Sequence, residues 1–325
     1  MRRFTAAATA ATLGLALAAG AVASSASARD LSDGPTLVPA LRTTLGSCPV
    51  FPADNPWHQD ISKLPLNAKS SAWVKSIGST TRLHPDFGTS WAGSPIGIPY
   101  ISVTTTTPKV PVSFRYKSES DKGPYPIPKS APIEGGSKST GDRHVIVVNT
   151  STCMLYELWD AHPVNGGTSW KAGSGAVFNL KSNKLRPAGW TSADAAGLPI
   201  FPGLVRYDEV SKGVIDHALR FTVAKTQAGY ITPARHFASS STNSNLPPMG
   251  ARFRLKASYS CAAFSREVRV ICTALKKYGM IVADNGSNWY VSGTHDSRWN
   301  DDHLGDLKKI PGSAFEAVDT GAIHH

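Results

Sequence analysis

Sulfur-containing residues and signature motifs are scarce in this sequence. Its 325 residues include four cysteines and four methionines, and no C-x-x-C pair occurs. The motifs G-x-S-x-G, H-E-x-x-H, the phosphate-binding G-x-x-x-x-G-K-[ST] and the calcium loop are all absent. The sequence therefore gives no support for an α/β-hydrolase, a zinc protease or a P-loop nucleotide enzyme.

Long apolar runs are also missing, except at the N-terminus. Two arginines, an Ala/Leu-rich stretch and the triplet Ala26-Ser27-Ala28 match a secretory signal peptide over residues 1–28. No later segment approaches the run of about 18 apolar residues that a membrane helix needs. We therefore predict a soluble protein that is secreted to the extracellular space and has no membrane span.

Basic residues outnumber acidic ones: the sequence has 34 lysines and arginines and 23 aspartates and glutamates, which gives a formal net charge of +11. Removal of the signal peptide takes away Arg2 and Arg3 and leaves 11 − 2 = +9. A basic protein can bind nucleic acid, but export and the lack of a nucleic-acid-binding motif argue against that partner.

The order of patterned segments predicts one domain that is mainly β. Residues 29–46 are polar and unpatterned, which indicates a flexible leader, and residues 47–325 form the predicted single β-rich domain. Short strand-like runs recur between Gly, Pro, Asn and Ser residues, a spacing typical of an antiparallel β-sandwich or jelly roll with two or three short helices. The predicted strands are "IPYISVT", "VPVSFRYK", "RHVIVVN", "CMLYELWDA", "GAVFNLKS", "VIDHALRFTV", "ARFRLKAS", "MIVAD" and "NWYVSG".

Helices and one hairpin are predicted from local signals. Helical periodicity with an N-terminal Ser265 and a terminal Gly279 predicts the longest helix over residues 265–279. Shorter helices are expected over residues 71–78 and 301–309. The Asn285-Gly286 pair, between two strand-like runs, predicts a β-hairpin with a type I′ turn.

An even number of cysteines in an exported chain favours disulfides over metal ligation. Three pairings of four cysteines are open. We expect Cys48 with Cys153, which would tie the N-terminal arm to the body, and Cys261 with Cys272, which would close a short loop at a helix start.

The segment "ARFRLKAS" places three cations on one side of a predicted strand. Arg252, Arg254 and Lys256 alternate with apolar residues, so successive side chains would point to opposite faces. Like charges at alternate positions repel each other unless carboxylates or an anionic ligand offset them. Both interpretations stay open here: a binding face for acidic groups, or a strand face compensated within the fold or simply solvated.

Two other strand-like segments carry carboxylates, which a glycan-cleaving enzyme needs as acid and base. Glu157 and Asp216 are the candidates for that pair, and His236, at a strand end before a polar loop, is the candidate assisting histidine. Trp159 and Trp190 are candidates for stacking on sugar rings. The pairs His84 with Asp86 and Asp142 with His144 have no recognised metal spacing, so neither a metal nor another cofactor is predicted.

Three stretches carry a resemblance to other proteins. "SESDKGPYPIPKSAPIEGG", "LRPAGWTSADAAGLPIFPGLVRYDEV" and the region from "LPPMGARFRLKAS" to "MIVADNGSNWYVSG" resemble a group of exported bacterial proteins typical of actinobacteria. The resemblance extends from about Asp54 to Thr320. It implies a single extended unit and no particular activity, so no catalytic residue is carried over from it.

These features predict a secreted carbohydrate-active enzyme that acts as a monomer on an extracellular polysaccharide, with glycoside hydrolysis as the default reaction. If the polymer is acidic, Arg252, Arg254 and Lys256 would bind its charged groups. A polysaccharide lyase is the first alternative, in which the cations neutralise a uronate and Tyr or His removes the adjacent proton. The second is a protein that binds an anionic cell-wall polymer without turnover.

Overall fold

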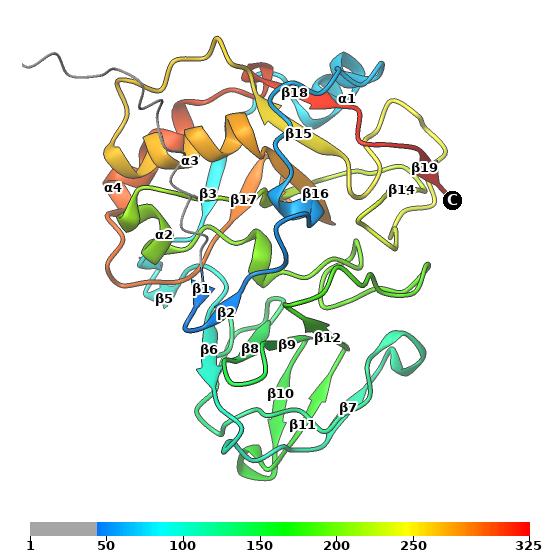
Figure 1. Ribbon diagram of the computed structural model, residues 1–325, viewed down its shortest axis with the longest axis vertical. Coiled ribbons are helices and arrows are strands. Elements are labelled where there is room, and N and C mark those ends of the chain that lie inside the picture. Colours follow the sequence, from blue (N-terminus) through cyan, green and yellow to red (C-terminus); the bar gives the residue numbers. More distant parts are fainter. Residues whose placement is uncertain (1–43) are drawn as a thin grey trace, which may run out of the picture. The chain divides into compact units, whose positions relative to one another are not determined.

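The computed structural model describes residues 44–325 (Figure 1). The predicted signal peptide and residues 29–43 of the predicted leader lie outside the described residues. At the end of that leader, β1 (Thr44–Leu45) pairs with β2 (Cys48–Pro49). The described residues are mostly strands in several sheets, with few short helices, as the sequence predicts.

A four-stranded sheet is built from buried segments in the middle of the chain. Its order is β12-β9-β8-β6, with β6 at Tyr100–Val103, β8 at Val145–Asn149, β9 at Met154–Trp159 and β12 at Ser174–Asn179. The five residues of β8 are all buried. Their uninterrupted apolar run reflects a strand covered on both faces, for which alternation is not required.

One face of this sheet contacts a smaller three-stranded sheet. That sheet has the order β10-β11-β7, formed by β7 (Val112–Phe114), β10 (His162–Val164) and β11 (Ser169–Ala172). Val145 and Val147 of β8 and Trp170 of β11 share a core on this side. Ile146 and Val148 point into the larger core on the other side.

The largest sheet has six strands in the order β18-β15-β16-β13-β17-β3. Their bounds are β3 His84–Asp86, β13 Leu219–Val223, β15 Arg252–Leu255, β16 Met280–Asn285, β17 Tyr290–Ser292 and β18 Phe315–Val318. Phe221, Phe253 and Trp289 pack ring to ring in the centre of the large core. Two-stranded pairs complete the described strands: β4 (Ser90–Trp91) with β5 (Ser94–Pro95), and β14 (Tyr230–Ile231) with β19 (Ile323–His324).

The sheets are mixed, so the predicted purely antiparallel pairing is wrong. Parallel pairs join β6 with β8, β7 with β11, β13 with β16 and β3 with β17. A parallel pair needs a crossover connection, which short turns cannot supply. Here the crossovers are long: residues 104–144 connect β6 to β8, and residues 224–279 lie between β13 and β16.

The predicted hairpin at Asn285-Gly286 is also wrong. β16 and β17 are not neighbours, because β13 lies between them, parallel to β16 and antiparallel to β17. The backbone N–H of Gly286 donates to Val223 at 3.0 Å, and Thr222 donates to the Ser287 carbonyl at 2.7 Å. The connection therefore crosses the end of β13. Contacts with this strand, which lies about 60 residues earlier in the sequence, override the local turn signal.

The helices follow the sequence more closely. α1 spans Ser70–Ile77 and α3 spans Arg266–Lys277, so the predicted helices over 71–78 and 265–279 are confirmed. α4 (Asp301–Leu304) continues into the 3-10 helix η5 (Gly305–Lys309), where a helix is predicted over 301–309. α2 (Tyr207–Lys212), a segment that the turn-like sequence does not predict as helical, is the fourth α-helix of the described residues.

The three cations of "ARFRLKAS" are held by the fold. Arg252 is 2% exposed and donates to the carbonyls of Tyr278, Pro56 and Gln59. Arg254 pairs with Glu316 of the adjacent β18 at 2.8 Å, and Lys256 donates to the Ser313 carbonyl. The row of charge is thus compensated mainly by backbone carbonyls, because chain segments cover what would be the exposed face of β15.

Both predicted disulfides are present. Cys48 is bonded to Cys153, with 105 residues of sequence separation, and Cys261 is bonded to Cys272, 11 residues away. The second joins the segment before α3 to the helix itself. Among residues 44–325, no helix has both the length and the apolar character needed to cross a membrane.

Candidate functional site

A pocket of about 380 Å³ collects carboxylates, aromatic rings and a histidine from distant parts of the chain. We call it the acidic pocket. Its polar and aromatic lining comes from Tyr116, Glu119, Asp142, Trp159, Ser174, Thr191, Ser192, Asp194, His236, Asp284 and Asn285. Within the part of the chain that the structure describes, no lysine or arginine lines it.

Two aromatic rings form one wall of the acidic pocket. Tyr116 precedes the 3-10 helix η2 (Lys117–Glu119), Trp159 ends β9, and their ring centroids lie 6.1 Å apart at an interplanar angle of 30°. Gly173, between β11 and β12, lies against the Trp159 ring, and a Cβ there would meet a ring carbon at 2.2 Å. Glycine at this position therefore allows the indole to lie where it does.

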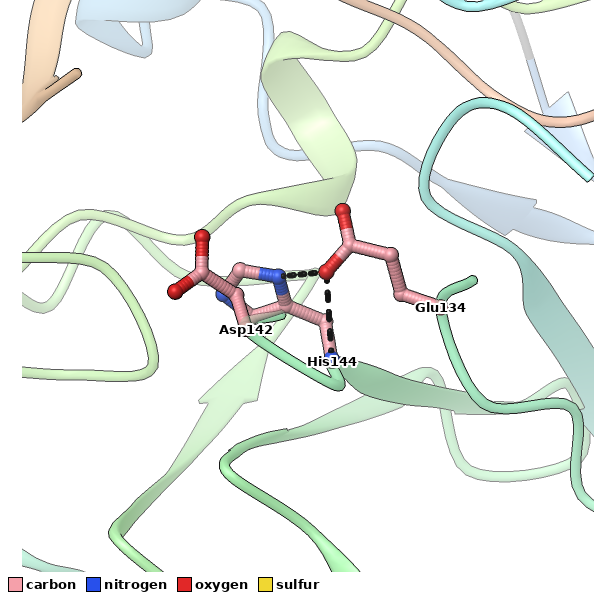
Figure 2. Close-up of side chains that lie close together, drawn as sticks. All are labelled: Glu134, Asp142 and His144. Atoms are coloured by element: carbon pink, nitrogen blue, oxygen red, sulfur yellow. Dashed lines mark hydrogen bonds and ion pairs between the residues drawn. The ribbon is translucent and has the colours of Figure 1, made fainter. Parts of the chain in front are cut away.

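Glu134, Asp142 and His144 form a compact group beside the pocket (Figure 2). The Glu134 carboxylate accepts from His144 Nδ1 at 2.6 Å and from the His144 backbone N–H at 3.3 Å. Asp142 lies on the other side of the imidazole and accepts from the Trp159 indole N–H at 3.2 Å. The group therefore connects the aromatic wall to the N-terminal end of β8.

His144 is best described as an imidazolium ion. Its Nε2 faces the Ala193 carbonyl at 3.1 Å while Nδ1 faces Glu134, so both ring nitrogens donate to oxygens that can only accept. Burial alone lowers the pKa of His144, but the Glu134 carboxylate outweighs burial and raises this pKa to about 9. The same pairing outweighs burial at Glu134 and lowers the pKa of that carboxyl.

This proton arrangement does not suit a metal ion. The ligand atoms of Glu134, Asp142 and His144 lie within 4.8 Å of one another, a separation that a cation could bridge. A metal-binding histidine, however, must be neutral and offer a lone pair. Since both nitrogens of His144 act as donors, the group is an ion pair in its present form.

A buried ion pair lies behind the acidic pocket. Arg220 of β13 donates to both oxygens of Asp194, from Nε at 2.9 Å and from Nη2 at 2.9 Å. Both side chains are at most 5% exposed. Two parallel bonds of this kind are the strong geometry for guanidinium and carboxylate, so the charge of Asp194 is largely neutralised by Arg220.

Asp284, near the end of β16, differs because its ion pair with Arg220 is longer than that of Asp194. Its side chain is 26% exposed in the pocket, its Oδ1 accepts from the Asn285 N–H at 2.7 Å, and its Oδ2 lies 3.7 Å from Arg220 Nη2. Burial and the neighbouring Asp194 carboxylate raise the pKa of Asp284 to about 7, although Arg220, the Asn285 N–H and His144 act in the opposite direction. The pKa of this carboxyl is thus well above that of an ordinary aspartate.

His236 lines the acidic pocket with an acceptor nitrogen. Its Nδ1 lies 2.7 Å from the Ala195 carbonyl, which can only accept, so Nδ1 carries a proton. In the neutral ring Nε2 then holds a lone pair, and among residues 44–325 no hydrogen bond to Nε2 is found. His236 can therefore accept a proton or a hydrogen bond from a molecule in the pocket.

The hydroxyl groups of the pocket are engaged with the backbone. Ser174 donates to the Ser192 carbonyl at 2.6 Å, and Ser192 donates to the Leu198 carbonyl at 2.6 Å. Thr191 donates to the Asp194 carbonyl at 3.2 Å. These hydroxyls hold the 191–198 loop in place, and no base activates one of them as a nucleophile within the described part of the pocket.

Backbone strain occurs next to the site. Arg143, between Asp142 and His144, has φ = 52°, and Asp160, which follows Trp159, has φ = 52°. Such values are costly for residues with a side chain and persist where the surroundings demand them. Buried Arg143 donates to the carbonyls of Ser137, Ser139 and Ala161, which holds the strained turn.

The acidic pocket contains two of the residues singled out from sequence, Trp159 and His236. Glu157 is fully buried, and its carboxylate accepts the N–H groups of Ile200 and Phe201 at 2.8–3.0 Å. Burial raises the pKa of Glu157 to about 7 against those two hydrogen bonds. With no exposure to the pocket, Glu157 is placed to hold the start of the 3-10 helix η4 (Phe201–Gly203).

Asp216 and Trp190 lie elsewhere. Asp216 is 6% exposed, does not line the acidic pocket, and its carbonyl accepts from His58. Trp190 lines a separate open hollow together with Arg115, Lys117 and Lys122, and its ring lies 5.6 Å from the Arg186 guanidinium. The structure thus does not bring Glu157 and Asp216 together in the pocket.

Several pocket residues are missed by sequence reasoning. Asp284 ends an apolar run before Asn-Gly and looks like a turn residue, and Asp194 lies in the loop "WTSADAAG" without any motif. Asp142 carries a weak signal, its spacing from His144. Only the fold brings the crossover before β8, the 191–198 loop and the end of β16 to one place.

No protein-family model matches the chain, and neither a curated protein nor a solved structure is similar to it.

Proposed function

We propose that this protein is an exported glycoside hydrolase whose reaction takes place in the acidic pocket. The observation that carries the proposal is that Asp284, a partly exposed carboxyl with a pKa near 7, lines the same pocket as a second carboxylate, Asp142, and an aromatic wall. Glycoside hydrolysis uses one protonated and one ionised carboxyl group. The two disulfides and the predicted signal peptide support export.

In this proposal Asp284 is the general acid. Its O–H protonates the glycosidic oxygen as the bond between that oxygen and the anomeric carbon breaks, which leaves Asp284 as a carboxylate. Arg220 and the Asn285 N–H, which already lie next to this carboxyl, stabilise the charge that it acquires. General acid catalysis of this kind contributes on the order of 10²–10⁴ in rate.

Asp142 is assigned the second role. Its carboxylate either removes a proton from water as that water attacks the anomeric carbon, or attacks the carbon itself, depending on the distance between the two carboxyl groups in the complex. The Trp159 N–H orients Asp142. Trp159 and Tyr116 offer ring faces to the sugar, and His236 Nε2 accepts a hydrogen bond from a hydroxyl or from water.

The scaffold that we propose is a layered β-sandwich, supported by the two cores on either side of the four-stranded sheet. The lyase alternative has less support, because the described lining of the pocket contains no arginine or lysine to neutralise a uronate. The binding alternative relies on the cations of β15. Arg252 and Arg254 are occupied with carbonyls and Glu316, and Lys256 donates to the Ser313 carbonyl, which gives that alternative less support.

The test is to incubate the purified protein with neutral, cationic and anionic polysaccharides and to measure new reducing ends and the absorbance of unsaturated uronates. We expect new reducing ends without unsaturation. The variant Asp284→Asn should lose at least about 100-fold in rate. Asp302→Asn, a change of the same chemistry at an exposed residue of α4, is the matched control and should keep full activity.

Nuclear magnetic resonance of the first product then distinguishes inversion from retention at the anomeric carbon. Unsaturated products would show that the reaction is an elimination and not a hydrolysis. Absence of any product, or an Asp284→Asn variant as active as the control, would refute the assignment of Asp284 and of the pocket.

A further inference from the structure

The acidic pocket has an unbalanced charge. Four carboxylates line it, Glu119, Asp142, Asp194 and Asp284, and within the described residues no lysine or arginine does. Arg220 contacts Asp194 through two hydrogen bonds and reaches Asp284 only at 3.7 Å. The positive charge of His144 is compensated by the Glu134 carboxylate. Among the described residues, no lysine or arginine pairs with Glu119 or Asp142, whereas Asp284 is the carboxyl that carries the proton in the proposed reaction.

A nearby carboxyl responds to the same negative potential. Asp86 ends β3, and its pKa is raised by partial burial and then by the negative charges of Glu134 and Asp142. Arg220 acts in the opposite direction and is outweighed. The charges of Glu134 and Asp142 thus act on a carboxyl outside the pocket lining.

The carboxylates are positioned relative to the aromatic wall. Asp142 accepts from the edge of the Trp159 indole at 3.2 Å. Glu119 belongs to the turn that begins at Tyr116, since its N–H donates to the Tyr116 carbonyl. Its side chain is fixed by the Thr191 N–H, which donates to Oε2 at 3.1 Å. Asp142 thus contacts one ring of the wall directly, and Glu119 lies in the turn that carries the other ring.

This arrangement suits a particular kind of sugar. A pyranose ring that stacks on an aromatic face directs its equatorial substituents outward, toward the edges of that face. An ammonium group in such a position would reach a carboxylate and form a charge-assisted hydrogen bond. A uronate would meet like charge, and a neutral sugar would leave the carboxylates without a counter-charge.

Two cationic features oppose the binding of an ammonium group, but the carboxylates outweigh them inside the pocket. Arg115 lies 5.1 Å from the Trp159 ring centroid, but it is paired with Asp160 at 3.4 Å and its side chain is 57% exposed. The whole chain is basic, with a formal net charge of +11. Exposed charges farther than about 8 Å away are largely screened at physiological ionic strength, whereas partly buried charges in the pocket are screened much less.

We infer that the acidic pocket binds a positively charged amino sugar through Glu119 and Asp142, so that the substrate is a polysaccharide with free amino groups. The inference rests on the proposed glycoside hydrolysis, which it makes more specific. Glu119 acts in it as the specificity-determining residue, because Asp142 and Asp284 are assigned to the chemistry.

The experiment compares three β-1,4-linked hexasaccharides that differ only at C2: an amine (glucosamine), an acetamide (N-acetylglucosamine) and a hydroxyl (glucose). Hydrolysis of each is measured at pH 5.5 with the purified protein. We expect kcat/KM for the amine to exceed that for either neutral hexamer at least about tenfold. Glu119→Gln should reduce this ratio by about tenfold, and the matched control Asp302→Asn should leave it unchanged.

Binding to the Asp284→Asn variant, measured by calorimetry, separates the two claims. Preferred cleavage of a neutral hexamer would overturn the inference and leave the proposed hydrolysis intact. If no hexamer is cleaved but the amine binds in a manner that weakens with Glu119→Gln and with added salt, the inference holds and the hydrolase proposal fails. Absence of both cleavage and amine binding would overturn the inference.

Discussion

Replacing Asp284 with asparagine should make the protein more stable at alkaline pH. The carboxyl is a partly buried group whose pKa is about 7 in the folded state, against 3.8 for the ordinary side chain. An ionised Asp284 is therefore disfavoured in the fold relative to the unfolded chain. Asparagine has the same shape and cannot ionise, so it removes that cost. The effect does not depend on knowing the substrate.

The magnitude follows from proton linkage. Between the unfolded pKa and the folded pKa, the folded state binds the additional proton, so stability increases as the pH falls through about 7 and levels off near 4. At pH 5 the protonated carboxyl lies two units below the folded pKa, which corresponds to about 3 kcal/mol at 1.36 kcal/mol per unit. At pH 8 this contribution is close to zero.

The assay is urea unfolding of the wild-type protein and of Asp284→Asn at pH 5 and pH 8. Glu157 and His144, whose pKa values are raised to about 7 and about 9, also make the fold less stable as pH rises. Both remain in the variant, so the difference between the two proteins isolates Asp284. We expect the gain from pH 8 to pH 5 to be about 3 kcal/mol smaller in the variant.

Two results would contradict this reasoning. If the variant and the wild type gain equally on acidification, Asp284 does not titrate near 7 in the fold. If the variant is less stable than the wild type at pH 8, contacts of the carboxylate with Arg220 and the Asn285 N–H outweigh its burial. The control Asp302→Asn, at an exposed site, should follow the wild type at both pH values.

Two further predictions concern stability. Replacing Cys48 and Cys153 together by serine should lower the free energy of unfolding by about 5 kcal/mol, and replacing Cys261 and Cys272 by about 3 kcal/mol, because the first pair closes the far longer loop. Urea unfolding measures both losses, and equal losses would contradict an effect governed by loop length. Arg252→Met should cost about 3 kcal/mol or more, since it removes a buried guanidinium that donates to the carbonyls of Tyr278, Pro56 and Gln59. Sugar binding should stay unchanged; a loss of binding with full stability would show a ligand-binding role instead.

Local features of this chain follow from its sequence. The helical spacing between Ser265 and Gly279 and the apolar runs of β8 and β16 produce the elements that they predict, because these patterns match the repeat of the helix or the covered strand. Both disulfides match the pairing that the sequence predicts, out of three that were open. Local signals were sufficient for the helix, because its hydrogen-bond partners lie within the same segment.

The sheet order and the site were decided by tertiary structure. The Asn285-Gly286 signal is typical of a hairpin, yet β13 occupies the place next to β16 and the connection crosses its end. For the row of cations that begins at Arg252, the sequence left open whether the face binds a ligand or is compensated within the fold. In the structure, the chain near residues 56–64 covers Arg252 and Arg254 and supplies carbonyls.

The acidic pocket depends even more on long-range contacts. Asp142, Asp194 and Asp284 are separated by 52 and 90 residues; the first two lie in segments whose pattern indicates a turn or loop, and Asp284 ends the strand-like run "MIVAD". By itself the sequence predicted the longer helices, most strand segments, the disulfides and an expected route of export. Which carboxylates share a pocket, and which are neutralised by arginine, was determined only by the fold, because the potential at each carboxyl is the sum over neighbours that the sequence does not place.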